Sequence, residues 1–243
     1  MEPLELSRYR RCVVLTGAGI SAGAGLPTYR GPGGLWNDAD VRARSHRDAL
    51  SDLDGLWSFF GPLRASVLAA APTIAHRSLV AIKERFPALA VTILTQNVDG
   101  LHQRAVGSVD IDVVELHGSL LRSRCTACER PSYADSVGHV AAPRCDGCGG
   151  GVRPDVVLFE EALGVDEERK ARRALADCDL FLAIGTSGSV WPASSFVRSA
   201  HYAGARTCFV NLEPKAVSNP YFGSSHLGPA DEVLPALLGA TGT

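Results

Sequence analysis

The sequence predicts an α/β fold in which helices cover both faces of an open parallel sheet. Short apolar runs rich in Val, Ile or Leu alternate along the chain with longer stretches whose apolar residues recur at helical spacing. The short runs are below the usual helix length and are typical of strands buried on both faces. Their alternation with the helical stretches favours an open α/β sheet.

Five short apolar runs are expected to form the strands, and they are residues 12–16, 91–95, 113–116, 180–185 and 207–211. Three longer stretches are expected to form helices that precede or connect these strands, and they are residues 74–86, 166–176 and 191–203. The stretch 166–176, DEERKARRALA, is charged and amphipathic, so one face can pack on the sheet while the other meets solvent.

Two regions interrupt the alternation of strands and helices. Residues 31–71 carry Gly, Trp and Asp early and then a helix-like stretch at 53–68, while residues 122–151 have no long apolar run. Both regions are expected to be insertions that form a small domain. The expected division gives residues 1–33, 73–121 and 152–243 to the sheet domain, residues 34–72 to a helical insertion, and residues 122–151 to a metal-binding module.

The length, the net charge and the apolar runs indicate the number of domains, the kind of partner and the location of the protein. A chain of 243 residues suits one large domain or one domain with a small insertion. The formal net charge of −2 gives no reason to expect nucleic acid or an anionic membrane as the main partner. The N-terminal residues are polar and charged, and no apolar run approaches the roughly 18–20 residues of a membrane span. A cytoplasmic protein is therefore expected.

Four of the seven cysteines form two CxxC pairs separated by sixteen residues, and they are Cys125, Cys128, Cys145 and Cys148. Two such pairs can supply four thiolates to one tetrahedral zinc ion with no open position, which predicts a structural site. A redox role is the weaker alternative, because each pair lies in a loop-rich insertion. Cys12, Cys178 and Cys208 lie in apolar runs and are interpreted as small buried hydrophobes.

A glycine-rich turn follows the first predicted strand. Gly17 and Gly19 give the first half of a GxGxxG pattern, with Ala22 in the third place. Such a turn allows close approach of a ligand, and a helix that begins there can bind pyrophosphate. A plain strand-to-helix turn is the alternative. The acidic residue expected about 20 residues further on is missing, so an ordinary dehydrogenase is not indicated.

Polar residues follow the other predicted strands. Gln96, Asn97 and Asp99 come directly after residues 91–95, at the end of a strand where ligands bind in such sheets. These side chains are costly to bury without partners. The alternative is a polar turn in which Asp99 caps the next helix. The segments 185–187 and 211–213 end later strands, and their hydroxyl and amide groups suit phosphate or ribose contacts or a helix cap.

His117 lies just past the predicted strand 113–116 and precedes Gly118. An imidazole with a pKa near neutrality suits a general base. His102 is interpreted as structural support. The remaining histidines are interpreted as structural, and they are His46, His76, His139, His201 and His226.

The ordered motifs resemble the sirtuin family of NAD-dependent protein deacylases, in its bacterial branch. The motifs are GAGISAGAGLPTYRG at 17–31, TQNVDGLH at 95–102, His117 with Gly118, the two CxxC pairs, RPDVV at 153–157, GTS at 185–187, NLE at 211–213 and DEVLP at 231–235. The resemblance covers almost the whole chain. It implies a Rossmann-like parallel sheet domain with a smaller zinc-binding and helical insertion domain.

The resemblance also implies the site residues. The catalytic residues would be His117, Asn97 and Asp99. The NAD-binding residues would be Gly17, Ala18, Gly19, Ile20, Tyr29, Arg30, Gln96, Asn97, Asp99, Gly185, Thr186, Ser187, Asn211, Glu213 and Ala230. The zinc ligands would be the four paired cysteines, and the residues that bind an extended acyl-lysine peptide by strand addition would be Val156, Val157, Phe159 and Glu160.

The reaction implied by the resemblance consumes NAD. The acyl-lysine carbonyl oxygen would attack C1′ of the nicotinamide ribose and expel nicotinamide. His117 would then deprotonate a ribose hydroxyl, which leads to free lysine and O-acyl-ADP-ribose. A protein ADP-ribosyltransferase and an NAD hydrolase on the same fold are the alternatives, and a nucleotide sensor without catalysis is disfavoured because binding alone needs no base.

Two departures from the family pattern concern the acylated substrate. Glu160 stands where the family usually has glycine, at the edge of the expected peptide groove. The Tyr-x-x-Arg motif of desuccinylating relatives is also unmatched, because Phe60 replaces the Tyr and Arg64 stands at the wrong offset. An acidic acyl chain would need that Arg and hydroxyl. Acetyl or another neutral acyl group is therefore expected.

Overall fold

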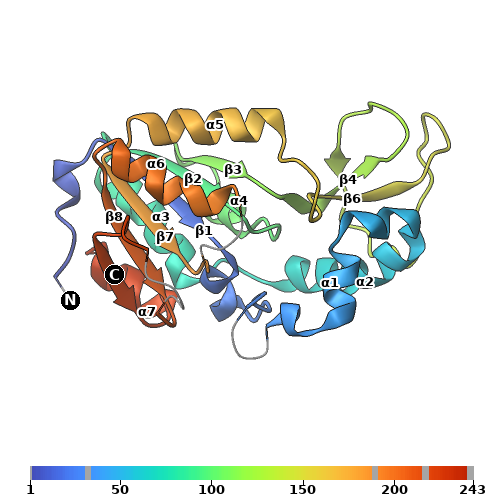
Figure 1. The fold of residues 1–243 in the computed structure, drawn as a ribbon, viewed down its shortest axis with the longest axis horizontal. Helices are drawn as coiled ribbons and strands as arrows, with labels where there is room; N and C mark the ends of the chain where they lie inside the picture. Colours follow the sequence, from blue (N-terminus) through green and yellow to red (C-terminus); the bar gives the residue numbers. More distant parts are fainter. Residues whose placement is uncertain (1, 31–33, 188–190, 215–218, 240–243) are drawn as a thin grey trace.

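The computed structural model describes residues 2–30, 34–187, 191–214 and 219–239, and two sheets organise them (Figure 1). The larger sheet has six parallel strands in the order β3-β2-β1-β7-β8-β9. The smaller sheet is antiparallel, with the order β5-β4-β6. The strands are β1 (Arg11–Thr16), β2 (Ala90–Thr95), β3 (Asp112–Glu115), β4 (Gly118–Cys125), β5 (Tyr133–Ala134), β6 (Val152–Val156), β7 (Leu180–Ile184), β8 (Arg206–Asn211) and β9 (Ser224–Leu227).

The helices connect these strands and cover them. They are α1 (Ala39–Arg44), α2 (Leu53–Ala69), α3 (Ile74–Arg85), α4 (Leu101–Val106), α5 (Val165–Ala176), α6 (Phe196–Tyr202) and α7 (Ala230–Leu237). Short 3₁₀ turns lie at Leu6–Arg8, Ala18–Ile20, Ala22–Ala24, Leu35–Asn37, Arg47–Ser51 and Ala193–Ser195.

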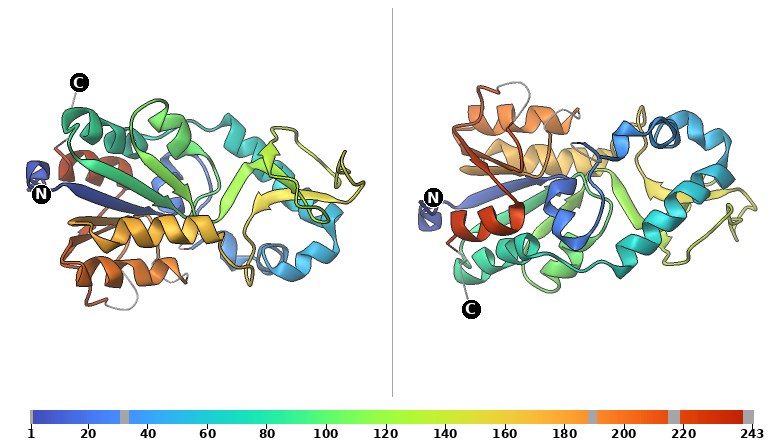
Figure 2. Two further views of the ribbon diagram at one scale, coloured as in Figure 1. Left: turned by 90° about the horizontal axis from the view of Figure 1, so that it is seen from above. Right: turned by 90° about the horizontal axis from the view of Figure 1, so that it is seen from below.

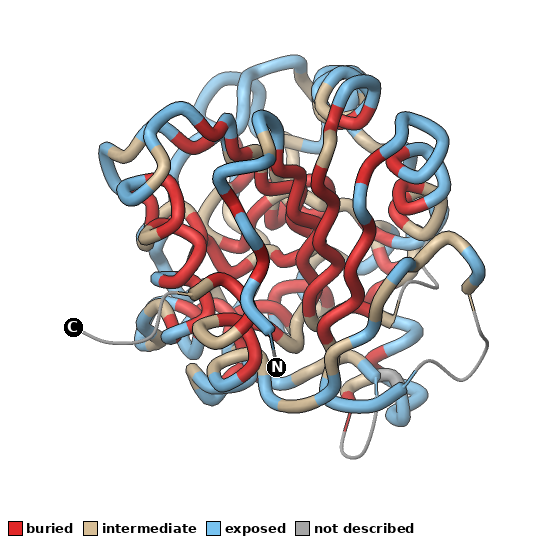
Figure 3. The backbone as a smooth tube through the Cα atoms, turned by 90° about the vertical axis from the view of Figure 1, so that its left-hand side faces the viewer, coloured by how far each residue is buried: buried red, intermediate tan, exposed pale blue. Residues whose placement is uncertain are grey.

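The predicted parallel sheet with helices on both faces is confirmed. The helices α3 and α7 pack on one face, and α5 and α6 pack on the other (Figure 2). Successive side chains of β1 alternate between the two cores, so that Val14 faces the first and Leu15 the second. The strands at the centre of this sheet are buried along most of their length (Figure 3).

Four elements of the large sheet domain differ from the prediction, because β9, α4 and α7 were not among the expected strands and helices and α6 is shorter than expected. β9 was not expected, because its sequence Ser-Ser-His-Leu has no apolar run and lies at the partly exposed edge of the sheet. The helix expected over 191–203 is shorter, since α6 begins only at Phe196 after a 3₁₀ turn. Pro192 disfavours helical backbone at Trp191, and the 3₁₀ turn Ala193–Ser195 occupies the residues between Pro192 and α6.

The smaller sheet packs against α2. Leu56 and Phe60 of this helix share a core with Leu120 and Val156 of the sheet. The fully buried Trp57 points to the cysteine pairs, and its indole nitrogen donates to the carbonyl oxygen of Val152 at 2.7 Å. The helix therefore joins the cysteine module to the rest of the molecule.

Within the described residues, no single helix has both the length and the apolar character of a membrane span. Only α2 and α3 taken together meet those criteria, and they are bent by 55° at the break between them.

Candidate active site

The predicted site residues gather at one edge of the large sheet. Because β1, β2, β3, β7 and β8 all run parallel, their carboxyl ends meet at the same edge. The glycine turn follows β1, the segment 96–99 follows β2, and His117 follows β3. Gly185, Thr186 and the segment 211–213 end or follow β7 and β8.

The glycine turn packs tightly against the end of β7. The amide of Gly19 donates to the carbonyl oxygen of Gly185 at 2.9 Å, and a Cβ atom on Gly19 would lie 2.6 Å from the Cα of Gly185. Glycine is therefore required for the two loops to approach. The expectation that a regular helix begins here is wrong, because two 3₁₀ turns follow β1 instead. The side chain of Ile20 is buried in the core, so only its backbone can face a ligand.

Ser21, Asn97 and Asp99 form a buried polar cluster behind this turn. The Ser21 hydroxyl donates to Asp99 Oδ2 at 2.7 Å and accepts from Asn97 Nδ2 at 3.2 Å. The other carboxylate oxygen of Asp99 accepts the amide of Leu101, the first residue of α4, but the N-cap of that helix is Gly100 and not Asp99 as the alternative interpretation expected. Ser21 was not among the predicted site residues. Its place inside the glycine motif was the available signal, but the partners lie more than 70 positions away.

Gln96 joins the ends of three strands. Its side-chain amide donates to Thr186 Oγ1 at 2.8 Å, after β7, and to the carbonyl oxygen of Thr16 at 3.3 Å, in β1. The hydroxyl of Thr16 also contacts Nε2 of the buried His102 at 2.9 Å. His102 therefore supports the strand ends from behind, as predicted.

His117 is oriented by a hydrogen bond to the segment after β2. Its Nδ1 lies 3.0 Å from the carbonyl oxygen of Gln96. A carbonyl oxygen only accepts, so Nδ1 carries the proton and Nε2 keeps a lone pair. Burial lowers the pKa of His117, and the hydrogen bond to Gln96 offsets this only in part. The ring is therefore neutral at pH 7 and can accept a proton at Nε2.

A small pocket with a cavity volume of about 30 Å³ opens beside this cluster. Its polar wall contains Ser21, Asn97 and Asp99, and Tyr29 also lines it. Burial raises the pKa of Tyr29 to about 12, so its hydroxyl stays protonated. Arg30 is exposed, and the rest of its motif, residues 31–33, lies outside the described residues.

The residues expected to bind the adenosine half lie further along the same edge. Asn211 ends β8, and its side-chain amide donates to the carbonyl oxygen of Glu213 at 3.2 Å, which shapes that turn. Ala230 is the first residue of α7, and Ser187 follows Thr186 after β7.

The four paired cysteines converge, with all their sulfur atoms within 4.8 Å of one another. The Sγ atoms of Cys125 and Cys148 are 3.5 Å apart, and those of Cys128 and Cys145 are 3.8 Å apart. A tetrahedral zinc with bonds of about 2.3 Å requires sulfur separations of about 3.8 Å. The amide of Ala127 donates to Cys125 Sγ and lowers the pKa of that thiol to about 6. The geometry fits one structural zinc ion.

The segment after β6 is held between the two expected domains. The amide of Val157 donates to the carbonyl oxygen of His117 at 2.9 Å. Phe159 exchanges backbone hydrogen bonds with Ser45 and Arg47. Glu160 has a φ of +68°, the one positive value among the described residues other than glycine. A positive φ favours glycine, which explains why the family pattern has glycine at this position. Glu160 adopts the same backbone conformation.

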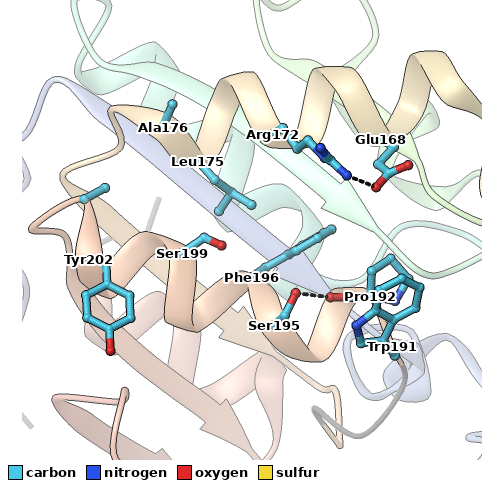
Figure 4. Close-up of a pocket in the computed structure, with 11 residues that line it drawn as sticks. Glu168, Arg172, Leu175, Ala176, Trp191, Pro192, Ser195, Phe196, Ser199 and Tyr202 are labelled. Carbon is cyan, nitrogen blue, oxygen red and sulfur yellow. Dashed lines mark hydrogen bonds and ion pairs between the residues drawn. The ribbon is translucent and has the colours of Figure 1, made fainter.

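A larger hollow lies between α5 and α6 (Figure 4). Phe196 and Leu175 form its floor, and Trp191 and Tyr202 stand largely exposed at its rim. None of the predicted site residues lines it. The strand-end cluster, rather than this hollow, is the candidate active site.

The fold is a Rossmann-like parallel sheet with a buried polar cluster and a histidine at its carboxyl edge, and a four-cysteine module adjoins it. The Sir2 family model matches residues 17–192, and the chain belongs to this family. It is 40% identical over 236 residues to the NAD-dependent protein deacylase 2 of Pyrobaculum aerophilum, covering 96% of this chain and 92% of that protein. It is 42% identical to the NAD-dependent protein deacylase 1 of Pseudomonas aeruginosa, with 96% and 95% covered.

Solved structures of Sir2 proteins also resemble this chain over nearly its whole length. A complex of a Sir2 homologue with NAD superposes with a TM-score of 0.86 at 34% identity, covering 97% of this chain and 90% of that one. A Sir2 variant in complex with a deacetylated p53 peptide and 3′-O-acetyl ADP-ribose superposes with a TM-score of 0.83 at 29% identity, with 97% and 95% covered.

Proposed function

We propose that the protein is an NAD-dependent protein lysine deacylase, most directly a deacetylase. It is an enzyme of the transferase class that moves the acyl group from lysine to ADP-ribose and releases nicotinamide. The observation that carries this proposal is the contact between His117 Nδ1 and the carbonyl oxygen of Gln96, which assigns the proton of the neutral ring to Nδ1 and leaves Nε2 as the acceptor. Such an imidazole suits deprotonation of a ribose hydroxyl.

The polar cluster supplies the second part of the mechanism. Asp99, fixed by Ser21 and by the amide of Leu101, offers a carboxylate to the carboxamide of nicotinamide, and Asn97 and Gln96 face the adjoining ribose. We assign NAD contacts to the predicted set: Gly17, Ala18, Gly19, Ile20, Tyr29, Arg30, Gln96, Asn97, Asp99, Gly185, Thr186, Ser187, Asn211, Glu213 and Ala230. NAD is a co-substrate, so the site needs no group that accepts hydride.

The zinc ion has a structural role in this proposal. Cys125, Cys128, Cys145 and Cys148 occupy all four positions of a tetrahedron, which leaves none for substrate. We also propose the domain division given above, with residues 34–72 and 122–151 forming the small domain. The peptide would lie along Val156, Val157, Phe159 and Glu160, between the two domains.

The pocket wall supports a neutral acyl group. Leu63 and Val67 of α2 line the pocket beside the polar cluster, and Leu63 stands three residues after Phe60, where the acidic-acyl motif has Arg. Arg64 cannot replace it, because its side chain is fully buried against Asp135 on the other side of α2. A carboxylate on the acyl chain would therefore be desolvated without a cation.

An acylated protein is the expected partner, with no requirement for nucleic acid or membrane, and the expected location is the cytoplasm. The experiment incubates the enzyme with NAD and an acetyl-lysine peptide and follows products by mass spectrometry. Equal amounts of free lysine peptide and O-acetyl-ADP-ribose are expected. ADP-ribose attached to protein would indicate the transferase alternative, and free ADP-ribose formed without peptide would indicate an NAD hydrolase.

The base assignment has its own test. We expect His117→Ala to reduce turnover by at least about 100-fold, the usual contribution of a general base, while calorimetry still detects NAD binding. Because the pKa of His117 is lowered below 6.5, the active neutral form persists as pH falls, and kcat/KM should decline only below that value. Full turnover in His117→Ala would refute the assignment.

A further inference from the structure

Arg122 of β4 joins the two sheets through two carboxylates. Its Nη1 pairs with Glu115, the last residue of β3 in the large sheet. Its Nε lies 3.1 Å from Asp155 Oδ2, in β6 of the small sheet. Only 14% of the Glu115 side chain and 17% of the Asp155 side chain are exposed. Both carboxylates therefore depend on this guanidinium for charge compensation.

Arg122 spans the turn between β3 and β4, which contains His117 and is called the joint below. Gly118 has a φ of +75°, and a Cβ atom there would lie 2.0 Å from the carbonyl oxygen of Asp155. On the other side of the turn, the Val157 amide donates to the carbonyl oxygen of His117. The backbone of His117 is thus tied directly to the start of the segment proposed to bind the acyl peptide.

The charges continue from this joint along the small sheet. Arg124 lies 3.7 Å from the second oxygen of Asp155 and 3.5 Å from Glu161. Arg153 holds both oxygens of Glu161, at 2.7 and 2.8 Å. Glu161 in turn accepts the amide of Leu158 at 2.8 Å. A continuous series of alternating charges therefore connects Glu115, two residues before the base, with the segment 157–161.

We propose that Arg122 is a positioning residue that sets the separation between the His117 imidazole and the acyl-peptide segment after β6. The inference rests on the proposed deacylase function. A planar guanidinium can hold two carboxylates at fixed angles, whereas a lysine ammonium offers a single point of charge on a flexible stem. Arg122 donates no proton to the reaction. It acts through the two strands that it joins.

The test uses Arg122→Met and Arg122→Lys in the full chain. Because small misplacements of reacting groups are costly, we expect the KM for an acetyl-lysine peptide to rise about tenfold or more and kcat to fall. The NAD affinity measured by calorimetry should stay within about twofold of wild type, as no predicted NAD contact touches Arg122. Hydrogen exchange at the Val157 amide should accelerate. Arg172→Met, which breaks a surface pair with Glu168 on α5, is the matched control and should change none of these.

A second variant separates positioning from simple charge balance. Glu115→Gln combined with Arg122→Met removes the Glu115 carboxylate that Arg122 compensates, while Asp155 keeps Arg124, so we expect this variant to stay folded, as circular dichroism would verify. We expect this variant to retain the raised peptide KM and the faster exchange at Val157. Wild-type values in the double variant, or an unchanged Val157 amide in Arg122→Met, would overturn the proposal. If the wild-type protein transferred no acyl group, the proposed function would fail, while the Val157 measurement would still test the joint.

Discussion

At the scale of single residues, Glu160 holds a backbone conformation that its side chain disfavours. Its φ of +68° belongs to the left-handed region, which costs an ordinary residue about 1–2 kcal/mol relative to glycine. The turn is fixed by the Glu161 amide, which donates to the carbonyl oxygen of Leu158 at 3.0 Å. The exposed carboxylate of Glu160 lies 3.3 Å from His46 Nε2, a surface pair of small energetic value.

We predict that Glu160→Gly is more stable than Glu160→Ala by about 1 kcal/mol. Both changes remove the contact with His46, so their difference isolates the backbone strain, although the greater freedom of glycine in the unfolded chain subtracts from it. Urea unfolding of the two variants measures the difference. Equal unfolding free energies would mean that the turn relaxes and stores no strain.

The sequence predicted the residues whose local pattern is sufficient and missed those defined by distant partners. The four cysteines and His117 became candidates because their spacing, or their position after a strand, is visible along the chain. Ser21 and Arg122 were missed as functional candidates. Their partners Asp99 and Asp155 are remote in sequence, and only the folded chain brings these groups together.

At the scale of elements, one face of α2 lines the candidate pocket and the other packs against the cysteine module. Leu63 and Val67 line the candidate pocket, while Arg64 is buried against the cysteine module, with Nη1 3.0 Å from Asp135 Oδ2 and the guanidinium 4.6 Å from the Trp57 ring. Burial opposes ionisation of Asp135, but hydrogen bonds, led by that from Ser123, lower its pKa to about 2. Asp135 is therefore a carboxylate that needs its cation.

Removal of that cation should be costly. We predict that Arg64→Met lowers the free energy of unfolding by about 3–5 kcal/mol, because Asp135 stays buried and charged without its guanidinium and keeps only the hydrogen bonds from Ser123, His139 and the Val137 amide. Arg44→Met, which breaks the exposed pair of Arg44 with Asp52, should cost less than about 1 kcal/mol. Denaturant unfolding compares them. Adding Asp135→Asn to Arg64→Met should recover part of the loss, and no recovery would exclude the uncompensated charge as its cause.

Strands with an apolar run were predictable, even β3 at the edge of the large sheet, and short polar strands were not. The runs that form β1, β2, β3, β7 and β8 are rich in Val, Ile or Leu, so the sequence itself indicates that they pack in the core. By contrast, β9 and the short β5 consist largely of exposed or partly exposed residues, and their pairing depends on neighbours already in place. The helices α2, α3 and α5 were predicted to within a residue or two.

At the scale of the whole molecule, the two sheets are stabilised differently. The large sheet lies between two extensive apolar cores. Around the cysteines, the buried cluster consists only of Trp57, Cys145 and Val152 with a few partly buried neighbours. So little apolar surface cannot order the chain around it, so the free energy of metal binding must contribute to its folding.

Zinc removal should therefore unfold one part of the protein before the other. We predict that a chelator releases one zinc ion per chain and abolishes amide protection in residues 122–151, with weaker protection in α2 through the loss of Trp57 packing. Amides of β1 and β7 should stay protected. Hydrogen exchange with mass spectrometry resolves the two regions, and added zinc should reverse the change. Simultaneous loss of protection in both sheets would show a single cooperative unit instead.

The strand order also has a consequence for synthesis of the chain. β1 lies at the centre of the large sheet, with β2 on one side and β7 on the other. β2 ends at Thr95, but β7 begins only at Leu180, so translation at about 5–20 residues per second leaves the second edge of β1 unpaired for several seconds or longer. An apolar strand with an open edge is a template for pairing with other chains. A nascent chain that has not yet reached Ile184 therefore depends on chaperones or dilution, and this dependence ends when β7 takes its place.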